Sequence, residues 1–286
     1  MDSLRPLGSS GILVSPIGLG TVKIGRNTGV KYPRPFDLPS DADVRILLRT
    51  AAEVGVNLID TAPAYGVSEQ RLGEALHHLN WLGSRQQWII STKVGEEFDS
   101  LAGGSGASRF DFSAQAVHAS VLRSLARLRT DYLDIVLIHS DGHDQRIIAD
   151  RGAIDALRLL KDRGLVRAIG ISIKSAAGGF AAISPATKPH WCDVLMCTLN
   201  PSYVDELDLI RAAHARGVGV LIKKAFQSGH LAPDSLGPTT TAAPVDPFAF
   251  IFQGARDAAS SVVVGTISPD HLRANVAAAR RAITSS

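Results

Sequence analysis

Three apolar stretches of the chain read VNLID at residues 56–60, WIISTK at 88–93 and LDIVLIH at 133–139. Each has the length and the composition of a buried β-strand. Each also ends in an ionisable residue, and these are Asp60, Lys93 and His139. The stretches therefore predict three strands with chemically active side chains at their carboxyl ends.

Similar apolar runs recur along the chain and alternate with stretches of helical periodicity, as in a parallel sheet wrapped by helices. The strands that we predict are Pro16–Leu19, Val56–Ile59, Trp88–Thr92, Leu133–Ile138, Ala168–Ser172, Val194–Cys197, Val218–Ile222 and Ser261–Val264. The helices that we predict are Asp41–Val54, Ser68–His78, Phe112–Leu128, Ala153–Asp162, Tyr203–Ala215 and Pro269–Ile283. Eight strands with intervening helices predict an α/β fold, a closed (β/α)₈ TIM barrel, after a short N-terminal hairpin with its turn at Gly8 to Gly11.

The alternative architecture is a doubly wound dinucleotide-binding sheet, which needs GxGxxG between its first strand and helix. Gly18-Leu19-Gly20 begins such a pattern, but Lys23 stands where the third glycine is required for close helix packing. The pattern therefore favours the barrel.

Length and composition predict one barrel domain over residues 1–286, with 45% hydrophobic residues. A formal charge of +3, with scattered Lys and Arg, gives no sign of a nucleic-acid partner. Cys192 and Cys197 have neither disulfide nor zinc-site spacing, so we expect buried thiols and no metal. No apolar run approaches the ~18 residues of a membrane span. We therefore expect a cytoplasmic protein without membrane or protein partners.

Three long loops follow the first, third and seventh predicted barrel strands, at Ile24–Ser40, Gly95–Asp111 and Ala225–Asp246. Barrel enzymes build their sites from the loops at this carboxyl end. We therefore interpret the three loops as walls of a substrate pocket.

Asp60, Lys93 and His139 end neighbouring strands and should meet at one rim, with Tyr65 five residues beyond Asp60. Reduction of a carbonyl by hydride leaves an alkoxide that needs a proton, and a free phenol with a pKa near ~10 gives one up poorly. We expect Lys93 to lower the pKa of Tyr65 and Asp60 to keep Lys93 charged. His139 can donate a hydrogen bond to the substrate oxygen. Taken singly, each residue also has a plain structural role, as a turn former, a loop aromatic or a satisfied histidine.

The stretch GVNLIDTAPAYG at residues 55–66 strongly resembles the aldo-keto reductases, and further similarity covers nearly the whole chain. The other matching residues are Ser68-Glu69, Leu72-Gly73, Ser91-Thr92-Lys93, Asp131–Asp134 through His139, Gly164–Ser172 and Gly265-Thr266 through Asn275. The resemblance implies a catalytic tetrad of Asp60, Tyr65, Lys93 and His139. It also implies NADP, or alternatively NAD, extended across the carboxyl rim of the barrel. The cofactor-binding residues that we assign are Gly20, Thr21, Asp60, Ser172, Lys223, Lys224, Gly265, Thr266, His271, Arg273 and Asn275.

The chain departs from the family pattern at the cofactor. Family members hold the nicotinamide amide with Ser-Asn and Gln, whereas here Ile173 follows Ser172 and Met196 replaces the Gln. Lys223-Lys224 replaces the usual aromatic-Ser pair, and we expect these lysines to bind the pyrophosphate or else to be solvated. Gly265 and His271 stand where Lys and Arg commonly grip the 2′-phosphate.

The function that we predict is NAD(P)-dependent oxidoreduction of an aldehyde, ketone, sugar or alcohol. One alternative is a lyase that forms a Schiff base on Lys93, although Asp60 should keep that lysine protonated. Another is a non-catalytic redox sensor that binds the cofactor, as some channel-associated family members do.

Overall fold

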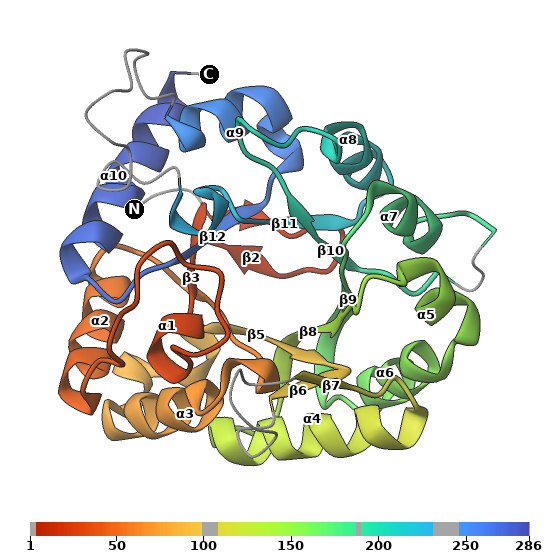
Figure 1. Cartoon of the computed structure of the whole chain (residues 1–286), viewed down its shortest axis with the longest axis horizontal. Helices are drawn as coiled ribbons and strands as arrows, with labels where there is room; N and C mark the ends of the chain where they lie inside the picture. Colours follow the sequence, from red (N-terminus) through yellow and green to blue (C-terminus); the bar gives the residue numbers. More distant parts are fainter. Residues whose placement is uncertain (1–3, 99–107, 187–189, 231–245, 286) are drawn as a thin grey trace.

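The computed structural model describes residues 4–98, 108–186, 190–230 and 246–285. Its centre is a closed barrel of eight parallel strands, with helices around the outside (Figure 1). In order around the barrel the strands are β3 (Ile17–Gly20), β4 (Leu58–Asp60), β5 (Ile89–Val94), β8 (Leu133–His139), β9 (Val166–Ser172), β10 (Val194–Thr198), β11 (Gly219–Lys223) and β12 (Ser261–Gly265). The predicted TIM barrel is therefore confirmed, and every predicted strand agrees with the structure to within two residues at each end.

The helices follow the predicted pattern less closely than the strands do. They are α1 (Val22–Gly25), α2 (Asp41–Glu53), α3 (Ser68–His78), α4 (Ala114–Leu128), α5 (Asp144–Asp150), α6 (Gly152–Asp162), α7 (Ala176–Ala182), α8 (Leu207–Ala215), α9 (Pro247–Ala255) and α10 (Pro269–Thr284). The helix predicted from Tyr203 begins instead at Leu207, because Tyr203 pairs with Asn200 in an isolated β-bridge. The four helices that were not predicted are short, and α9 is also so rich in apolar residues that its periodicity is weak.

Two serine caps fix the helices that begin and end the barrel's outer ring. Ser40 accepts a hydrogen bond from the backbone N–H of Asp43 at 3.2 Å, and the Asp43 carboxylate accepts one from the Ser40 N–H at 3.0 Å. Ser268 Oγ accepts from the His271 N–H at 3.3 Å and caps α10, which Pro269 opens. None of the described helices has the length and apolar character required to cross a membrane.

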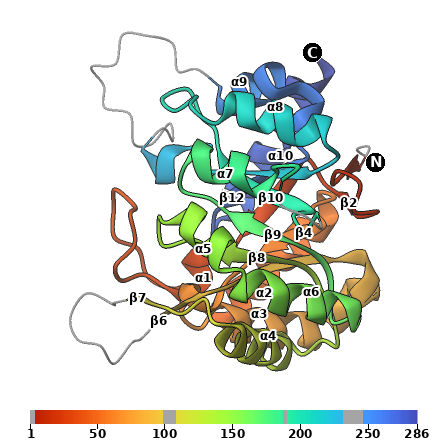
Figure 2. The ribbon, with the colours of Figure 1, turned by 90° about the vertical axis from the view of Figure 1, so that its right-hand side faces the viewer.

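The N-terminal hairpin closes one end of the barrel. Strands β1 (Arg5–Pro6) and β2 (Leu13–Val14) pair in antiparallel fashion, and Leu7 between them is fully buried. The hairpin packs on apolar side chains that fill the barrel interior, namely Leu58, Ile89, Ile135, Leu137, Ala168, Val194, Met196 and Leu221. A second hairpin, β6 (Glu96–Phe98) with β7 (Ser108–Phe110), lies at the opposite end (Figure 2). This second end, where the parallel strands have their carboxyl termini, is left open for a site.

Candidate active site

A cavity of about 650 Å³ lies over the carboxyl ends of the strands. Asp60 at the end of β4, Lys93 in β5 and His139 at the end of β8 all line it, together with Tyr65. The structure thus brings the four predicted catalytic residues to one pocket, as expected from the order of their strands around the barrel.

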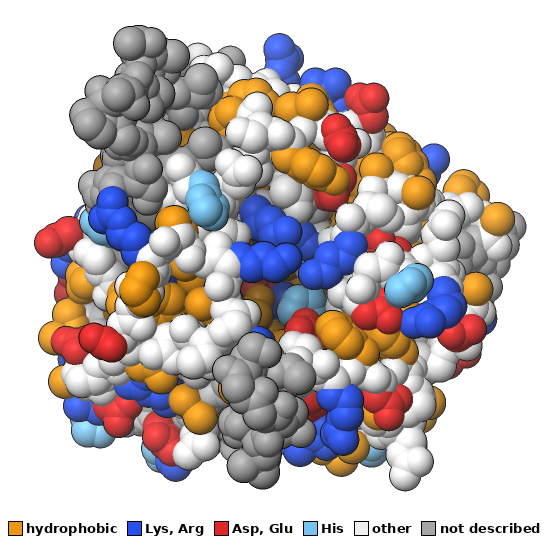
Figure 3. Space-filling model, viewed as in Figure 1, with side chains coloured by type: hydrophobic (Ala, Val, Ile, Leu, Met, Phe, Trp, Pro, Cys, Tyr) orange, Lys and Arg blue, Asp and Glu red, His pale blue; other side chains and the backbone are white. Residues whose placement is uncertain are grey.

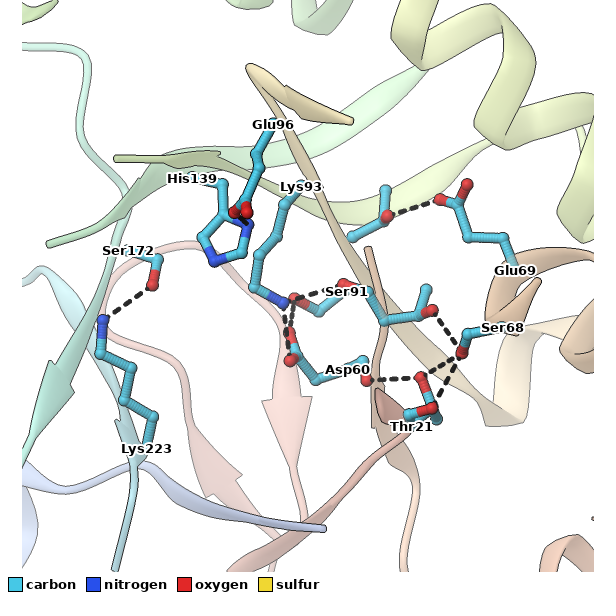
Figure 4. Close-up of polar contacts among 12 residues, drawn as sticks. Thr21, Asp60, Ser68, Glu69, Ser91, Lys93, Glu96, His139, Ser172 and Lys223 are labelled. Carbon is cyan, nitrogen blue, oxygen red and sulfur yellow. Dashed lines mark hydrogen bonds and ion pairs between the residues drawn. The ribbon is translucent and has the colours of Figure 1, made fainter. Parts of the chain in front are cut away.

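Asp60 and Lys93 form a buried ion pair beneath the pocket. Lys93 Nζ donates to Asp60 Oδ2 at 2.7 Å and to the Thr61 carbonyl at 2.8 Å, and only 1% of the lysine side chain is exposed. Asp60 Oδ1 accepts from Ser91 Oγ at 2.9 Å (Figure 4). Burial alone would lower the pKa of Lys93, but the charge of Asp60 and the contact with Tyr65 hold it above its ordinary value. Lys93 is therefore an ammonium group.

Tyr65 ends a short 3₁₀ helix, η1 (Pro63–Tyr65), that is held against α1 by two glycines. A Cβ on Gly25 would stand 2.4 Å from the Tyr65 carbonyl oxygen, and one on Gly66 would stand 2.3 Å from the Gly25 carbonyl oxygen. Gly66 also has a φ of +64°, which disfavours other residues. This close approach fixes the loop, so that the Tyr65 ring centre lies 4.8 Å from Lys93 Nζ.

The pKa of Tyr65 differs from the sequence-based expectation. Burial raises the pKa of the phenol above its ordinary value, and the charges of Asp60 and Glu96 add to the rise. Lys93 works against this shift through its charge and its hydrogen bond to the phenol. Lys93 therefore moderates the pKa of Tyr65 without bringing it below its ordinary value. Sequence reasoning missed this because it considered the lysine but not the burial.

His139 has a partner that the sequence analysis did not identify. Glu96 Oε2 lies 2.7 Å from His139 Nδ1, and each side chain is 14% exposed. The Tyr65 and His139 rings meet edge to face, with their centres 6.2 Å apart. Glu96 lies three residues beyond Lys93 in a loop already predicted to wall the pocket, and this position was the signal available in the sequence.

Most of the residues assigned to the cofactor line the same cavity, and two do not. The lining includes Gly20, Asp60, Ser172, Lys223, Lys224, Gly265, Thr266, His271 and Asn275. Thr21 is buried below the rim, where its hydroxyl donates to the Asp60 carbonyl at 3.0 Å and accepts from Ser68 at 2.8 Å. Arg273 points away, toward Glu53 on α2 at 2.7 Å. The structure therefore does not bring Thr21 and Arg273 to the pocket.

Lys223 lies deeper than its neighbour Lys224. Its Nζ donates to Ser172 Oγ at 2.9 Å and to the Ile173 carbonyl at 2.5 Å (Figure 4). Burial, followed by the charge of Lys174, lowers the pKa of Lys223 to about 7. Met196 lines the cavity beside these residues. Lys223 thus contacts Ser172. Ile173 and Met196, which replace the amide residues of the family pattern, lie beside this contact.

Cationic side chains dominate the mouth of the pocket. Figure 3 shows Lys and Arg gathered around the central hollow. Those that line the cavity are Lys23, Arg34, Lys93, Lys174, Lys223 and Lys224, and Asp60 is the one carboxylate among the described lining residues. Because Asp60 is taken by Lys93, the remaining charge is positive and suits an anionic ligand.

Parts of the first and third predicted loop walls reach the cavity, and none of the described residues of the second loop, 95–98 and 108–111, lines it. Tyr32, Pro33 and Arg34 come from the first loop, and residues 225, 226, 228 and 229 come from the third. The rest of the third loop, residues 231–245, and residues 99–107 of the second lie outside the described part of the chain.

A closed parallel barrel with a buried Asp–Lys pair, a tyrosine and a histidine at its carboxyl rim defines a class of barrel enzymes. The model of the aldo/keto reductase family matches residues 16–243 of the chain. The chain is 30% identical to L-galactose dehydrogenase of Arabidopsis thaliana over 96% of its own length and 87% of that protein. It is 25% identical to D-threo-aldose 1-dehydrogenase of a Pseudomonas species, over 81% of its own length and 72% of that protein.

A solved structure from Pseudomonas aeruginosa, assigned provisionally to the aldo-keto reductases, is 41% identical and superposes with a TM-score of 0.81. The similarity covers 99% of this chain and 96% of that one. The chain therefore belongs to the aldo/keto reductase family and is an oxidoreductase of the kind that uses NADPH or NADH.

Proposed function

We propose that the protein transfers hydride between a nicotinamide cofactor and a carbonyl or alcohol carbon, with Tyr65 as the proton donor for reduction. The observation that carries this proposal is the buried Lys93–Asp60 pair beside the phenol. Lys93 Nζ is 2.7 Å from Asp60 Oδ2 and 4.8 Å from the centre of the Tyr65 ring. A tyrosine held over a lysine of fixed charge is suited to proton transfer.

Burial and Lys93 shift the pKa of Tyr65 in opposite directions, and this suits a phenol that gives up its proton only as the alkoxide forms. Burial raises the pKa of the phenol, so the hydroxyl keeps its proton while the substrate is a neutral carbonyl. An alkoxide is a far stronger base than phenolate and takes the proton as it forms. The ammonium of Lys93 then stabilises the phenolate that remains, and Asp60 preserves that ammonium group.

The residues around the cavity fit a dinucleotide. When bound, the nicotinamide ring supplies or accepts the hydride. The residues that would hold the cofactor are Gly20, Asp60, Ser172, Lys223, Lys224, Gly265, Thr266, His271 and Asn275. Thr21 and Arg273 are not part of this proposal. Because the lining carries more cations than a pyrophosphate needs, we propose NADP as the cofactor and NAD as the alternative; calorimetric titration of the protein with each of the two distinguishes them.

The substrates to test first are sugars. L-galactose dehydrogenase and D-threo-aldose 1-dehydrogenase, two of the relatives, are named for the oxidation of sugars. A cavity of about 650 Å³ has room for a nicotinamide ring and a small polyhydroxy compound. We therefore propose an aldose, or a small hydroxyaldehyde related to it, as the substrate class.

The Schiff-base alternative is not supported by the state of Lys93. Attack on a carbonyl requires a neutral amine. The Lys93 nitrogen is buried, donates to Asp60 and Thr61, and has a raised pKa, so its lone pair is bound to a proton.

The second alternative is a redox sensor that binds the cofactor without catalysis. Turnover of any carbonyl or sugar by the protein would exclude a purely sensory role.

The decisive experiment compares wild type, Tyr65→Phe and Tyr132→Phe. Aldehydes, ketones and aldoses are screened with reduced cofactor, and alcohols and sugars with oxidised cofactor. Tyr65→Phe should bind the cofactor normally and lose about 10²-fold or more in turnover. Tyr132 precedes β8 at the opposite end of the barrel, where Arg85 stacks on its ring at 4.1 Å, so its Phe variant should behave as wild type. Near-normal turnover by Tyr65→Phe would remove Tyr65 from the mechanism.

A further inference from the structure

The partner of His139 determines what the histidine can offer to a substrate. Glu96 is the first residue of β6, which is held in place by its pairing with β7. Glu96 Oε2 lies 2.7 Å from His139 Nδ1, and Figure 4 shows the other ring nitrogen turned away from Glu96, into the space between Lys93 and Lys223. Nδ1 is buried and has no other hydrogen-bond partner in the described part of the chain.

The proton on Nδ1 follows from the charge of Glu96. Burial alone would raise the pKa of Glu96, but the charge and hydrogen bonding of His139, with help from Ser108, lower it to about 2. Glu96 is therefore a carboxylate at neutral pH. A bare Nδ1 would place its lone pair against a carboxylate oxygen at 2.7 Å, which is repulsive, so Nδ1 must carry a proton.

We propose that Glu96 keeps the ring proton of neutral His139 on Nδ1, so that Nε2 meets the substrate as a hydrogen-bond acceptor and becomes a donor only in the imidazolium form. This inference rests on the proposed function, because it assigns how the same site meets the substrate oxygen. It makes Glu96 a positioning residue, which acts through His139 and does not itself touch the substrate.

The charged groups around the ring favour its neutral form. Burial lowers the pKa of His139 below 6.5, Lys93 on β5 and Lys174 after β9 lower it further, and Glu96 raises it. Tyr65 meets the ring edge to face, and Arg26 after α1 faces Glu96. At neutral pH the ring is therefore uncharged, with its proton on the side of Glu96.

This state of His139 prefers a hydroxyl to a carbonyl. A neutral ring with Nε2 unprotonated can accept a hydrogen bond from the hydroxyl of an alcohol or a sugar. It cannot donate to a carbonyl oxygen, which was the role expected from sequence. Donation requires an imidazolium ion, which forms as the pH falls through the lowered pKa of His139. A decrease in pH should therefore increase the rate of carbonyl reduction by more than it increases the affinity for an alcohol.

Nitrogen NMR of the histidine rings tests the tautomer without any turnover. The His139 signals are assigned by their loss in His139→Gln, and the neutral ring is observed well above its pKa. Wild type should show a proton on Nδ1. In Glu96→Gln the amide can donate to Nδ1, so the proton should move to Nε2. Glu97→Gln is the matched control, because Glu97 bonds to Ser120 and Arg123 on α4, at 3.0 and 2.6 Å, and should leave His139 unchanged.

A pH profile provides the functional arm of the test. For wild type, kcat/KM of carbonyl reduction should fall as the pH rises through the pKa of His139. In Glu96→Gln the neutral ring is already a donor, so this fall should disappear, and Glu97→Gln should keep it. A neutral wild-type ring protonated on Nε2 would overturn the proposal, even if Glu96→Gln failed to fold. Absence of turnover in wild type would instead contradict the proposed function and leave the NMR result standing.

Discussion

The Lys93–Asp60 pair allows the sharpest prediction about stability. Lys93→Met preserves most of the side-chain volume but removes the ammonium that Asp60 faces at 2.7 Å. The two side chains are only 1% and 4% exposed, so water cannot replace the lost partner. Asp60 would keep Ser91 as a hydrogen-bond donor but would become a buried charge without a counter-ion.

Breaking a buried ion pair from one side costs about 3–5 kcal/mol, and we expect Lys93→Met to lose that much stability. Turnover should fall as well, because the charge that stabilises a Tyr65 phenolate is gone. The double variant Asp60→Asn with Lys93→Met leaves no unpaired charge. It should therefore be more stable than the sum of the two single changes predicts, by about 0.5–3 kcal/mol.

Urea unfolding at pH 7, followed by far-ultraviolet circular dichroism, measures these free energies. Lys161→Met is the matched control, because its pair with Asp193 is 38% exposed on the lysine side and should contribute only about 0–1 kcal/mol. A Lys93→Met protein within about 1 kcal/mol of wild type, or strictly additive single and double variants, would refute the assigned role of the pair.

Two further predictions concern Lys223, the last residue of β11, and Lys224, which follows it. Lys224→Ala should weaken binding of oxidised NADP about tenfold at low salt, which is the scale of a charge-assisted hydrogen bond. Added salt should reduce the difference in affinity between the variant and wild type. Equal affinities in a calorimetric titration would place Lys224 outside the cofactor site. The pKa of Lys223 is about 7 in the folded protein and near 10.5 in the unfolded chain, so the unfolded chain binds an extra proton between these values and stability should rise with pH across this range. Unfolding of wild type and Lys223→Met from pH 6.5 to 9.5 should show this slope only in wild type, and identical slopes would contradict the lowered pKa.

Much of the site could be predicted because a parallel barrel turns sequence order into spatial order. Once Asp60, Lys93 and His139 were placed at the ends of successive strands, their meeting at one rim followed from the fold. Tyr65 followed because it is only five residues from Asp60. The residues that were placed less well, Thr21 and Arg273, depend on which way a side chain turns. Thr21 turns toward Ser68 and Arg273 turns toward Glu53.

The sequence by itself determined the barrel, its strands to within two residues, and the four side chains at the rim, because strand periodicity and strand ends are local signals. The tertiary structure alone decided how burial shifts the pKa values of the side chains in the pocket. Burial raises the pKa of Tyr65 and lowers that of Lys223, and neither shift can be read from the order of residues. The structure alone also brought Glu96 to His139, because that contact joins a hairpin to a strand 43 positions further along the chain. Contacts of this kind depend on how loops fold over the barrel, and they decide the direction in which each catalytic group can move a proton.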